Sequence, residues 1–210
     1  MALSGAMLIL FLIGHLLGNL EIFAGQEAIN AYSVFLRSVP KLLWSFRIAV
    51  IVAFVAHIYT SVQLSIENKR ARPVNYVGKK SVAATFASRT MLLGGLVVLS
   101  FVLYHLAHFT FGITNPDHAA LIDAKGRPDV YTMVVLGFQN VYVSTMYIVA
   151  QVCLAFHLSH GFGSAAQTFG MTSCGCAKWI RISGSLFAFV LCALYISIPF
   201  SVLMGWLDAA

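Results

Sequence analysis

The sequence predicts an all-α protein: an integral membrane bundle of five transmembrane helices, with residues 1–210 forming one domain. The chain is 60% hydrophobic and only 10% charged, whereas a soluble domain carries about 25% charged residues. Its mean hydropathy is +0.86. The apolar residues gather in runs close to the ~20 residues that a helix needs to cross a bilayer. These runs cover residues 3–23, 42–66, 90–113, 141–168 and 180–206.

The first run has no basic segment before it and no clear small-residue cleavage site. We therefore expect it to remain as a helix of the mature protein rather than to be removed as a signal peptide. Residues 26–38 carry apolar side chains at helical spacing and are expected to form a short interfacial helix. Residues 114–140 are expected to form a loop on the same side of the membrane, irregular between Pro116 and Pro128.

The distribution of charge predicts the orientation of the bundle. Residues 67–89 contain six basic side chains and one acidic side chain. By the positive-inside rule, this loop and the loop at 170–180 lie in the cytoplasm, with the N-terminus inside and the C-terminus outside. Arg37 and Lys41, in a loop assigned to the outside, weigh against this assignment. No nucleic-acid partner is expected, because the basic residues flank apolar runs and lack interleaved aromatic side chains.

Each of the first four runs holds one deeply placed histidine, namely His15, His57, His105 and His157. A polar side chain in hydrocarbon is costly and usually functional. Counting along each run at 1.5 Å per residue pairs His15 with His105, and His57 with His157 roughly 8 Å closer to the cytoplasm. Two imidazoles at one depth on different helices are the axial ligands that a haem in a helical bundle needs.

The alternative without a cofactor is that these histidines only form hydrogen bonds between helices. His108 and His160 follow two of the ligand candidates by three residues and share a helix face with them. Each could be a rival ligand, a partner for a haem propionate or a donor to a ligating ring. Depth alone does not separate His157 from His160. Small residues near the histidines could let a macrocycle approach the backbone: Gly14, Gly18, Gly94, Gly95, Gly161 and Gly163.

The segments around these histidines carry a family resemblance. They are residues 14–19 (GHLLGN), 56–59 (AHIY), 104–106 (YHL), and 156–164 (FHLSHGFGS) with 167–170 (QTFG). Over nearly its whole length the chain resembles the dihaem cytochrome b membrane anchor of succinate:quinone oxidoreductases and quinol:fumarate reductases, in its single-chain, five-helix form. The resemblance implies one ligand from each of the first four helices. It selects His157 over His160, because the family's ligand stands 13 residues before the closing glycine, here Gly170.

The resemblance also implies cofactors and partners. The cofactors are two haem b groups, and the substrate is menaquinone or menaquinol. A flavoprotein subunit performs the dicarboxylate chemistry, and an iron–sulfur subunit docks on the cytoplasmic face of a bacterial inner membrane, where residues 67–89 could receive it. A dimer of such heterotrimers is left open. So are the direction of electron flow and the type of quinone, although the dihaem pattern leans toward menaquinone.

Further site residues are expected near the two haems. Propionate partners would be Ser4, Arg89 and Thr168 on the inner side, and His108, Lys41 and Arg47 on the outer side. Two positions depart from the family pattern: Ala155 replaces a glutamate associated with proton transfer, and Arg37 replaces an acidic residue near the quinol site. Glu27 is then the expected proton acceptor for quinol.

Three alternatives remain at this stage. One is a dihaem cytochrome b subunit of a hydrogenase or formate dehydrogenase, which shares the electron-transfer chemistry but serves another soluble partner. Another is a histidine-lined transporter for a metal ion or protons, which would need paired acids inside the spans. The last is a structural anchor without haem.

Overall fold

The computed structural model describes residues 1–71, 86–171 and 176–209, with the backbone alone for residues 86–90. Five helices in these ranges are long and apolar enough to cross a membrane: α1 (Ala2–Leu20, extended by the 3₁₀ turn η1, Glu21–Ala24), α3 (Pro40–Arg70), α4 (Phe86–His105, extended by the π-helical turn η2, Leu106–Thr110), α7 (Val141–Thr168) and α8 (Ala177–Leu203). They match the five apolar runs of the sequence. The chain therefore has the architecture of a multi-pass membrane protein.

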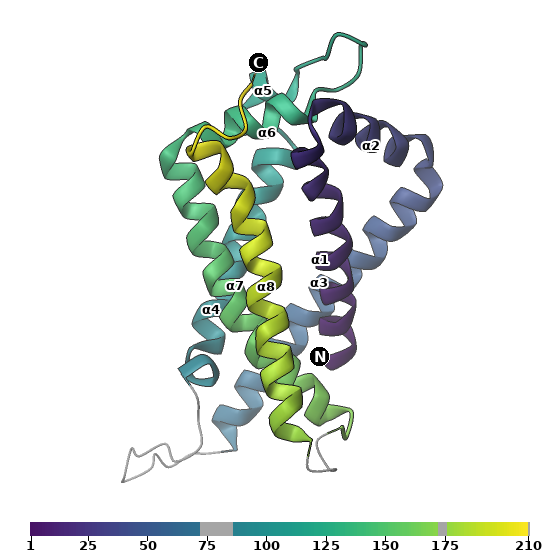
Figure 1. The fold of residues 1–210 in the computed structure, drawn as a ribbon. Helices are drawn as coiled ribbons and strands as arrows, with labels where there is room; N and C mark the ends of the chain where they lie inside the picture. The colour runs from purple at the N-terminus through teal and green to yellow at the C-terminus, as the bar shows by residue number, and fades with distance from the viewer. Residues whose placement is uncertain (72–85, 172–175, 210) are drawn as a thin grey trace.

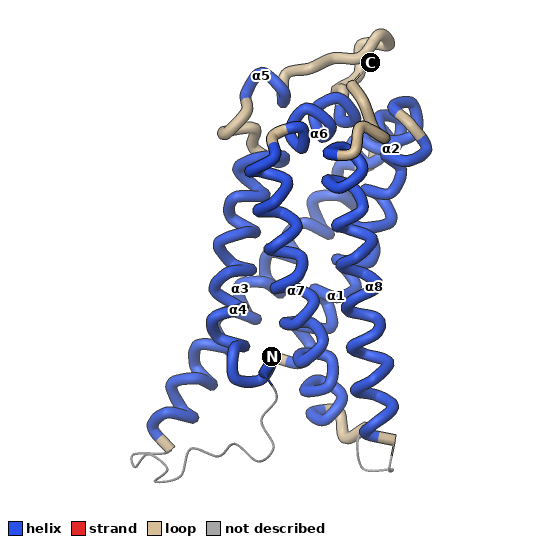
Figure 2. Tube along the Cα trace, turned by 60° about the vertical axis from the view of Figure 1, so that its left-hand side comes forward, coloured by secondary structure: helices blue, strands red, loops and turns tan. Residues whose placement is uncertain are grey.

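Three short helices lie together at one end of this bundle (Figures 1 and 2): α2 (Gln26–Ser38), α5 (Pro116–Ala119) and α6 (Val130–Gln139). The C-terminus lies at the same end, which we call the C-terminal end, and the N-terminus lies toward the other. The predicted interfacial helix at 26–38 is confirmed as a helix. Within the predicted loop at 114–140, the part expected to be irregular begins with the short helix α5, and α6, which the sequence did not predict, follows it.

Local chemistry explains where several of these helices begin. Pro40 opens α3 at a position where its missing N–H is not needed. The Asn140 side chain accepts hydrogen bonds from the N–H groups of Tyr142 and Val143 and so caps α7. Asp129 caps α6 in the same way by accepting from the Thr132 N–H at 3.2 Å. Between η1 and α2, Gly25 has a φ of 97°, a value that favours glycine.

The packing of the bundle is uneven. α7 packs along α8 and against α4, while α1 packs against α3. Two clusters of buried apolar residues form the core, and both draw on α7 and α8. By contrast, none of the side chains of α3 is buried. The side of the bundle built from α1, α3 and α4 therefore contributes little to the protein core.

A buried polar network ties α2 to the segment that precedes α6. Asn30 is fully buried, and its amide N–H donates to Asp129 at 3.0 Å and to Asp123 at 3.2 Å. Its carbonyl oxygen accepts from the Tyr131 N–H at 3.1 Å. Arg127 donates to Asp123 at 2.8 Å within the same layer. These bonds hold α2, α6 and the segment that precedes α6 together over the C-terminal end of the bundle. We call this part of the molecule the cap.

Candidate functional site

The structure brings the four histidines together in two pairs. His15 on α1 and His105 on α4 have ring centroids 5.8 Å apart, with an angle of 73° between the ring planes. His57 on α3 and His157 on α7 have ring centroids 6.3 Å apart, with an angle of 67°. These are the partners that depth counting selects, and each pair joins two different helices.

The two pairs lie farther apart along the bundle than the sequence suggested. Ser4 lies against His57, and eleven residues separate it from His15 on the same helix. Gly95 lies against His157, and ten residues separate it from His105. Both counts correspond to roughly 15–16 Å at 1.5 Å per residue, about twice the 8 Å expected. The counting assumed that all helices enter the bilayer at one level, but α1 begins well inside the end formed by α3 and α8 (Figure 1).

The ring separations fit an iron porphyrin. With metal–nitrogen bonds of about 2.0–2.1 Å and about 1.1 Å from nitrogen to ring centre, two opposed axial imidazoles have centroids about 6.3 Å apart. The observed separations of 5.8 and 6.3 Å lie at or just below this value. Among the described residues, no group of three or more His, Cys, Asp or Glu side chains is placed to hold a metal ion. Two imidazoles suffice when a macrocycle supplies the remaining four ligands.

Polar groups lie beside the Nδ1 atoms of three of the four rings. The Asn19 amide nitrogen donates to the His15 carbonyl at 2.6 Å and lies 3.1 Å from Nδ1 and 3.4 Å from Nε2 of the same ring. The Ser4 hydroxyl lies 3.4 Å from Nδ1 of His57, and the Tyr147 hydroxyl 3.4 Å from Nδ1 of His105. Hydroxyl partners of this kind can hold a ligating ring in place and leave Nε2 for the metal. The Nδ1 atom of His157 is buried without a partner.

The glycines near the histidines have three kinds of surroundings. A Cβ atom at Gly5 would lie 3.5 Å from His57, and one at Gly95 would lie 3.6 Å from His157. At Gly14, Gly94 and Gly161, a Cβ would meet no atom within 4 Å. Gly18 serves helix packing instead, since a Cβ there would come within 2.5 Å of the Tyr32 ring. Gly163 likewise faces Arg181.

The expected propionate partners have mixed surroundings. Ser4 donates to the Met1 carbonyl at 2.8 Å and touches His57. His108 is only 2% exposed, and its ring nitrogens lie 3.1 Å from the Tyr147 hydroxyl and 3.0 Å from the Asn115 amide. Both nitrogens are therefore taken by protein groups, which leaves none for a propionate. Arg89 falls in the turn of α4 whose side chains lie outside the described part of the chain, as do residues 72–85 of the basic loop.

Glu27 has a setting that does not suit a proton acceptor. Its exposed carboxylate pairs with Lys125 at 2.8 Å and with Arg127 at 2.8 Å. Hydrogen bonds from Arg127 and then Lys125 lower the pKa of Glu27 to about 2. A carboxylate with so low a pKa takes up a proton poorly at neutral pH. Its contacts instead tie the start of α2 to the polar network of the cap.

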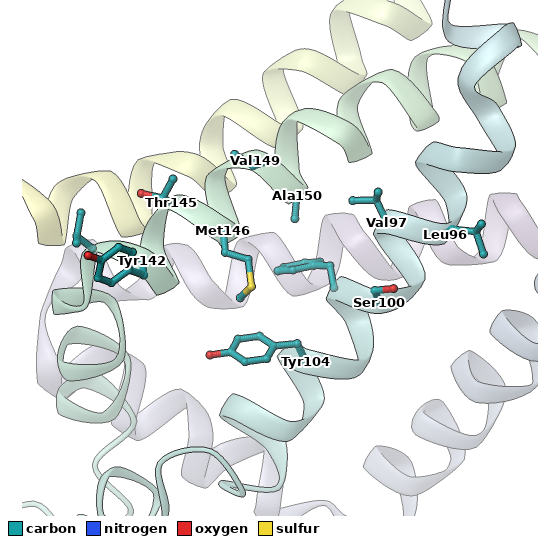
Figure 3. A pocket seen from close by; sticks show the side chains of 11 residues that line it. Leu96, Val97, Ser100, Tyr104, Tyr142, Thr145, Met146, Val149 and Ala150 are labelled. Atoms are coloured by element: carbon teal, nitrogen blue, oxygen red, sulfur yellow. The ribbon is translucent and has the colours of Figure 1, made fainter.

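A groove lies between α4 and α7 (Figure 3). It has a volume of about 820 Å³, within the range of small-molecule sites. Its walls are mostly apolar, with hydroxyl groups from Ser100, Tyr104, Tyr142 and Thr145. Phe101 forms part of the wall, and its ring centroid lies 5.9 Å from that of His105. The groove therefore offers an apolar path with hydroxyl groups beside one histidine pair.

Sequence reasoning missed Tyr147 as a neighbour of His105. No pattern singles it out, but depth counting could have placed it there. Tyr147 lies about six residues from one end of its apolar run, and His105 about eight residues from the corresponding end of its own run.

No protein-family model matches the chain, and no match was found among curated proteins or among solved structures.

Proposed function

We propose that this chain is the dihaem cytochrome b subunit that anchors a succinate dehydrogenase or fumarate reductase complex in a bacterial inner membrane. It would carry electrons between menaquinone or menaquinol and the iron–sulfur subunit. The observation that carries this proposal is the pair of imidazole couples, each shared by two apolar helices, at two levels of one bundle. The ring separations of 5.8 and 6.3 Å support it, because they suit one iron between each couple.

Each residue has a defined task in this proposal. His15 and His105 hold the haem nearer the C-terminal end, and His57 with His157 hold the other. When bound, a bis-histidine haem supplies one-electron transfer without an open position for substrate. Both couples lie on helices long and apolar enough to cross a membrane, and the Ser4 and Tyr147 hydroxyls would orient the rings of His57 and His105.

The quinone and the soluble subunits would meet opposite ends of the molecule. The groove between α4 and α7 supplies an apolar surface for a quinone close to His105. At the other end, Lys69 and Arg70 close α3 while Lys178 and Arg181 lie in the first turns of α8, and all four are exposed. Their positive charge supports a cytoplasmic location for this end and a surface on which the iron–sulfur subunit docks.

The experiment that tests the proposal is a reduced-minus-oxidised optical spectrum of the purified complex, combined with haem and protein quantitation. We expect two b-type haems for each chain, and electron transfer between succinate or fumarate and a menaquinone analogue. A preparation without haem would refute the proposal. Two haems with a copurifying hydrogenase or formate dehydrogenase activity would assign the chain to a different complex.

A further inference from the structure

A row of hydrogen-bonded side chains runs from the cap of the bundle to one histidine of the candidate site. The Asn115 amide lies 3.0 Å from Nε2 of His108, and Nδ1 of His108 lies 3.1 Å from the Tyr147 hydroxyl. The same hydroxyl lies 3.4 Å from Nδ1 of His105. Tyr147 thus bridges the imidazole of His105, which ends α4 and belongs to a candidate ligand pair, and that of His108 in η2.

Aromatic rings enclose this row on several sides. The Tyr147 ring meets those of Phe101 and Phe138 edge to face, with centroids 4.9 Å apart in both cases. The ring of His108 stacks on that of Phe109 at 3.9 Å. A Cβ at Gly137 would lie 3.1 Å from Nε2 of His108, so α6 also packs tightly against this ring. Tyr147 and His108 are 5% and 2% exposed, so both rings are buried.

The backbone of α4 changes its winding at the same place. Directly after His105 the helix passes into the π-helical turn η2, which contains His108. Such turns are rare and often mark functional sites. The change in winding therefore coincides with the two histidines that share the Tyr147 hydroxyl.

We propose that Tyr147 is a positioning residue for His105, an inference that rests on the proposed haem-binding function. The Tyr147 oxygen accepts the N–H at Nδ1 of His105, which keeps the proton away from Nε2 and leaves that atom for the iron. The Tyr147 O–H then donates to Nδ1 of His108. The N–H at Nε2 of His108 donates to the Asn115 side-chain carbonyl, with the amide turned so that its oxygen faces the ring.

The opposite direction of the row is incompatible with ligation. If the Asn115 amide N–H donates to His108, His108 donates to Tyr147 and Tyr147 donates to Nδ1 of His105. The His105 proton would then lie on Nε2, where the metal must bind. Metal binding therefore selects one direction for all three hydrogen bonds. The row in turn stabilises the tautomer and the orientation that binding requires.

The chain offers a matched pair of variants for the test. Tyr147→Phe keeps the aromatic packing and removes only the hydroxyl. Tyr195→Phe is the control: the Tyr195 ring lies 6.1 Å from that of His15, but its hydroxyl donates to the Leu12 carbonyl at 2.7 Å and not to an imidazole. Both variants are made in the full complex, and each haem is followed by redox titration, by electron paramagnetic resonance and by the rate of haem transfer to an apo-acceptor.

We expect Tyr147→Phe to raise the reduction potential of the haem at His15 and His105, because His105 becomes a weaker donor. Loss of haem from that site should accelerate on the order of 10- to 100-fold. The haem at His57 and His157 should not change, and Tyr195→Phe should affect neither. Equal effects of both variants, or none from Tyr147→Phe, would overturn the positioning role.

A second variant covers the case in which Tyr147→Phe does not assemble. His108→Leu removes the acceptor for the Tyr147 O–H without touching either candidate ligand of this haem, and it should change the same haem in the same sense. An unchanged potential in His108→Leu would overturn the inference. If the wild-type complex holds no haem, the proposed function itself fails. If it holds two haems and neither substitution changes their potentials, only the positioning role of Tyr147 fails.

Discussion

At the scale of single residues, Asn30 is a buried polar side chain whose hydrogen bonds join α2 to the segment before α6. It is fully buried and bonds to Asp123, Asp129 and the backbone of Tyr131. Asn30→Ala would remove the partner of the Tyr131 N–H and one donor from each aspartate, which keep their other hydrogen bonds, at a cost of about 1–3 kcal/mol. We expect a loss of at least this size in the free energy of unfolding, measured by denaturation in detergent micelles. Gln63→Ala is the control, since its exposed amide bonds only to Glu67, and it should stay within about 0.5 kcal/mol of wild type.

The ion pairs of Glu27 and Asp123 predict sensitivity to acid. The pKa of each carboxyl is lowered to about 2, from ordinary values of 4.5 and 3.8, chiefly by hydrogen bonds from Arg127. A lowered pKa contributes stability that is complete above the ordinary value and is lost as the pH falls toward the folded one. The melting temperature should therefore fall between about pH 5 and pH 2.

Substitution of the shared cation checks the origin of this fall. Arg127→Gln should melt lower at neutral pH and lose less on acidification, because it removes the largest single cause of the lowered pKa at both carboxyls. Glu67→Gln, far from the network, should retain the wild-type profile. An acid-side fall as steep in Arg127→Gln as in wild type would contradict this explanation.

Residues differ in how visible their roles are in the sequence. The four paired histidines were predictable, because an imidazole in an apolar run is conspicuous and its depth can be counted. Asn30 was not, because its partners lie far away in the chain and leave no periodic signal, whereas Tyr147 was missed although counting its depth would have placed it near His105. The ion pairs of Glu27 could not be predicted from the sequence, because Lys125 and Arg127 are distant in the chain and contact Glu27 only in the folded protein.

At the level of elements, the contact between α7 and α8 depends on one glycine. Gly184 is buried on α8, and a Cβ there would clash with the Phe162 ring of α7. Gly184→Ala forces these helices apart or moves the ring, at about 1–3 kcal/mol. The melting temperature of the complex should fall accordingly. Ser183→Ala, one residue earlier on an exposed face, should have little effect; equal stability of the two variants would show that the contact is looser than described.

The long helices were easier to predict than the short ones. The five apolar runs exceed the length of any competing element, so their existence followed from composition alone. α2 followed from its helical spacing. α6 did not, because its ten residues follow a proline-bearing loop and its helix depends on the Asp129 cap and on packing beside α8. The π-helical turn η2 was not predicted, because no pattern that we recognised in the sequence marks it.

For the whole molecule, the uneven packing indicates what a cofactor would contribute. The core lies on α7 and α8, while α1, α3 and α4 bury little of their apolar surface. Groups bound between the histidine pairs would connect the two sides, and binding to the folded state alone stabilises it.

Depletion of haem during expression should therefore expose α1 and α3 to proteolysis before α7 and α8. Limited digestion in micelles, followed by mass spectrometry, measures this order. Restoring haem should protect α1 and α3 and raise the melting temperature. Equal protection of all five helices with and without haem would contradict the idea that the cofactors complete the bundle.

The most direct test of the central claim is the haem content of four single variants. The pairing predicts that His15→Ala and His105→Ala each abolish the same haem and spare the other, as resolved by redox titration. His57→Ala and His157→Ala should abolish the second haem and spare the first. Loss of one and the same haem from both His15→Ala and His57→Ala, or retention of both haems in every variant, would contradict the account.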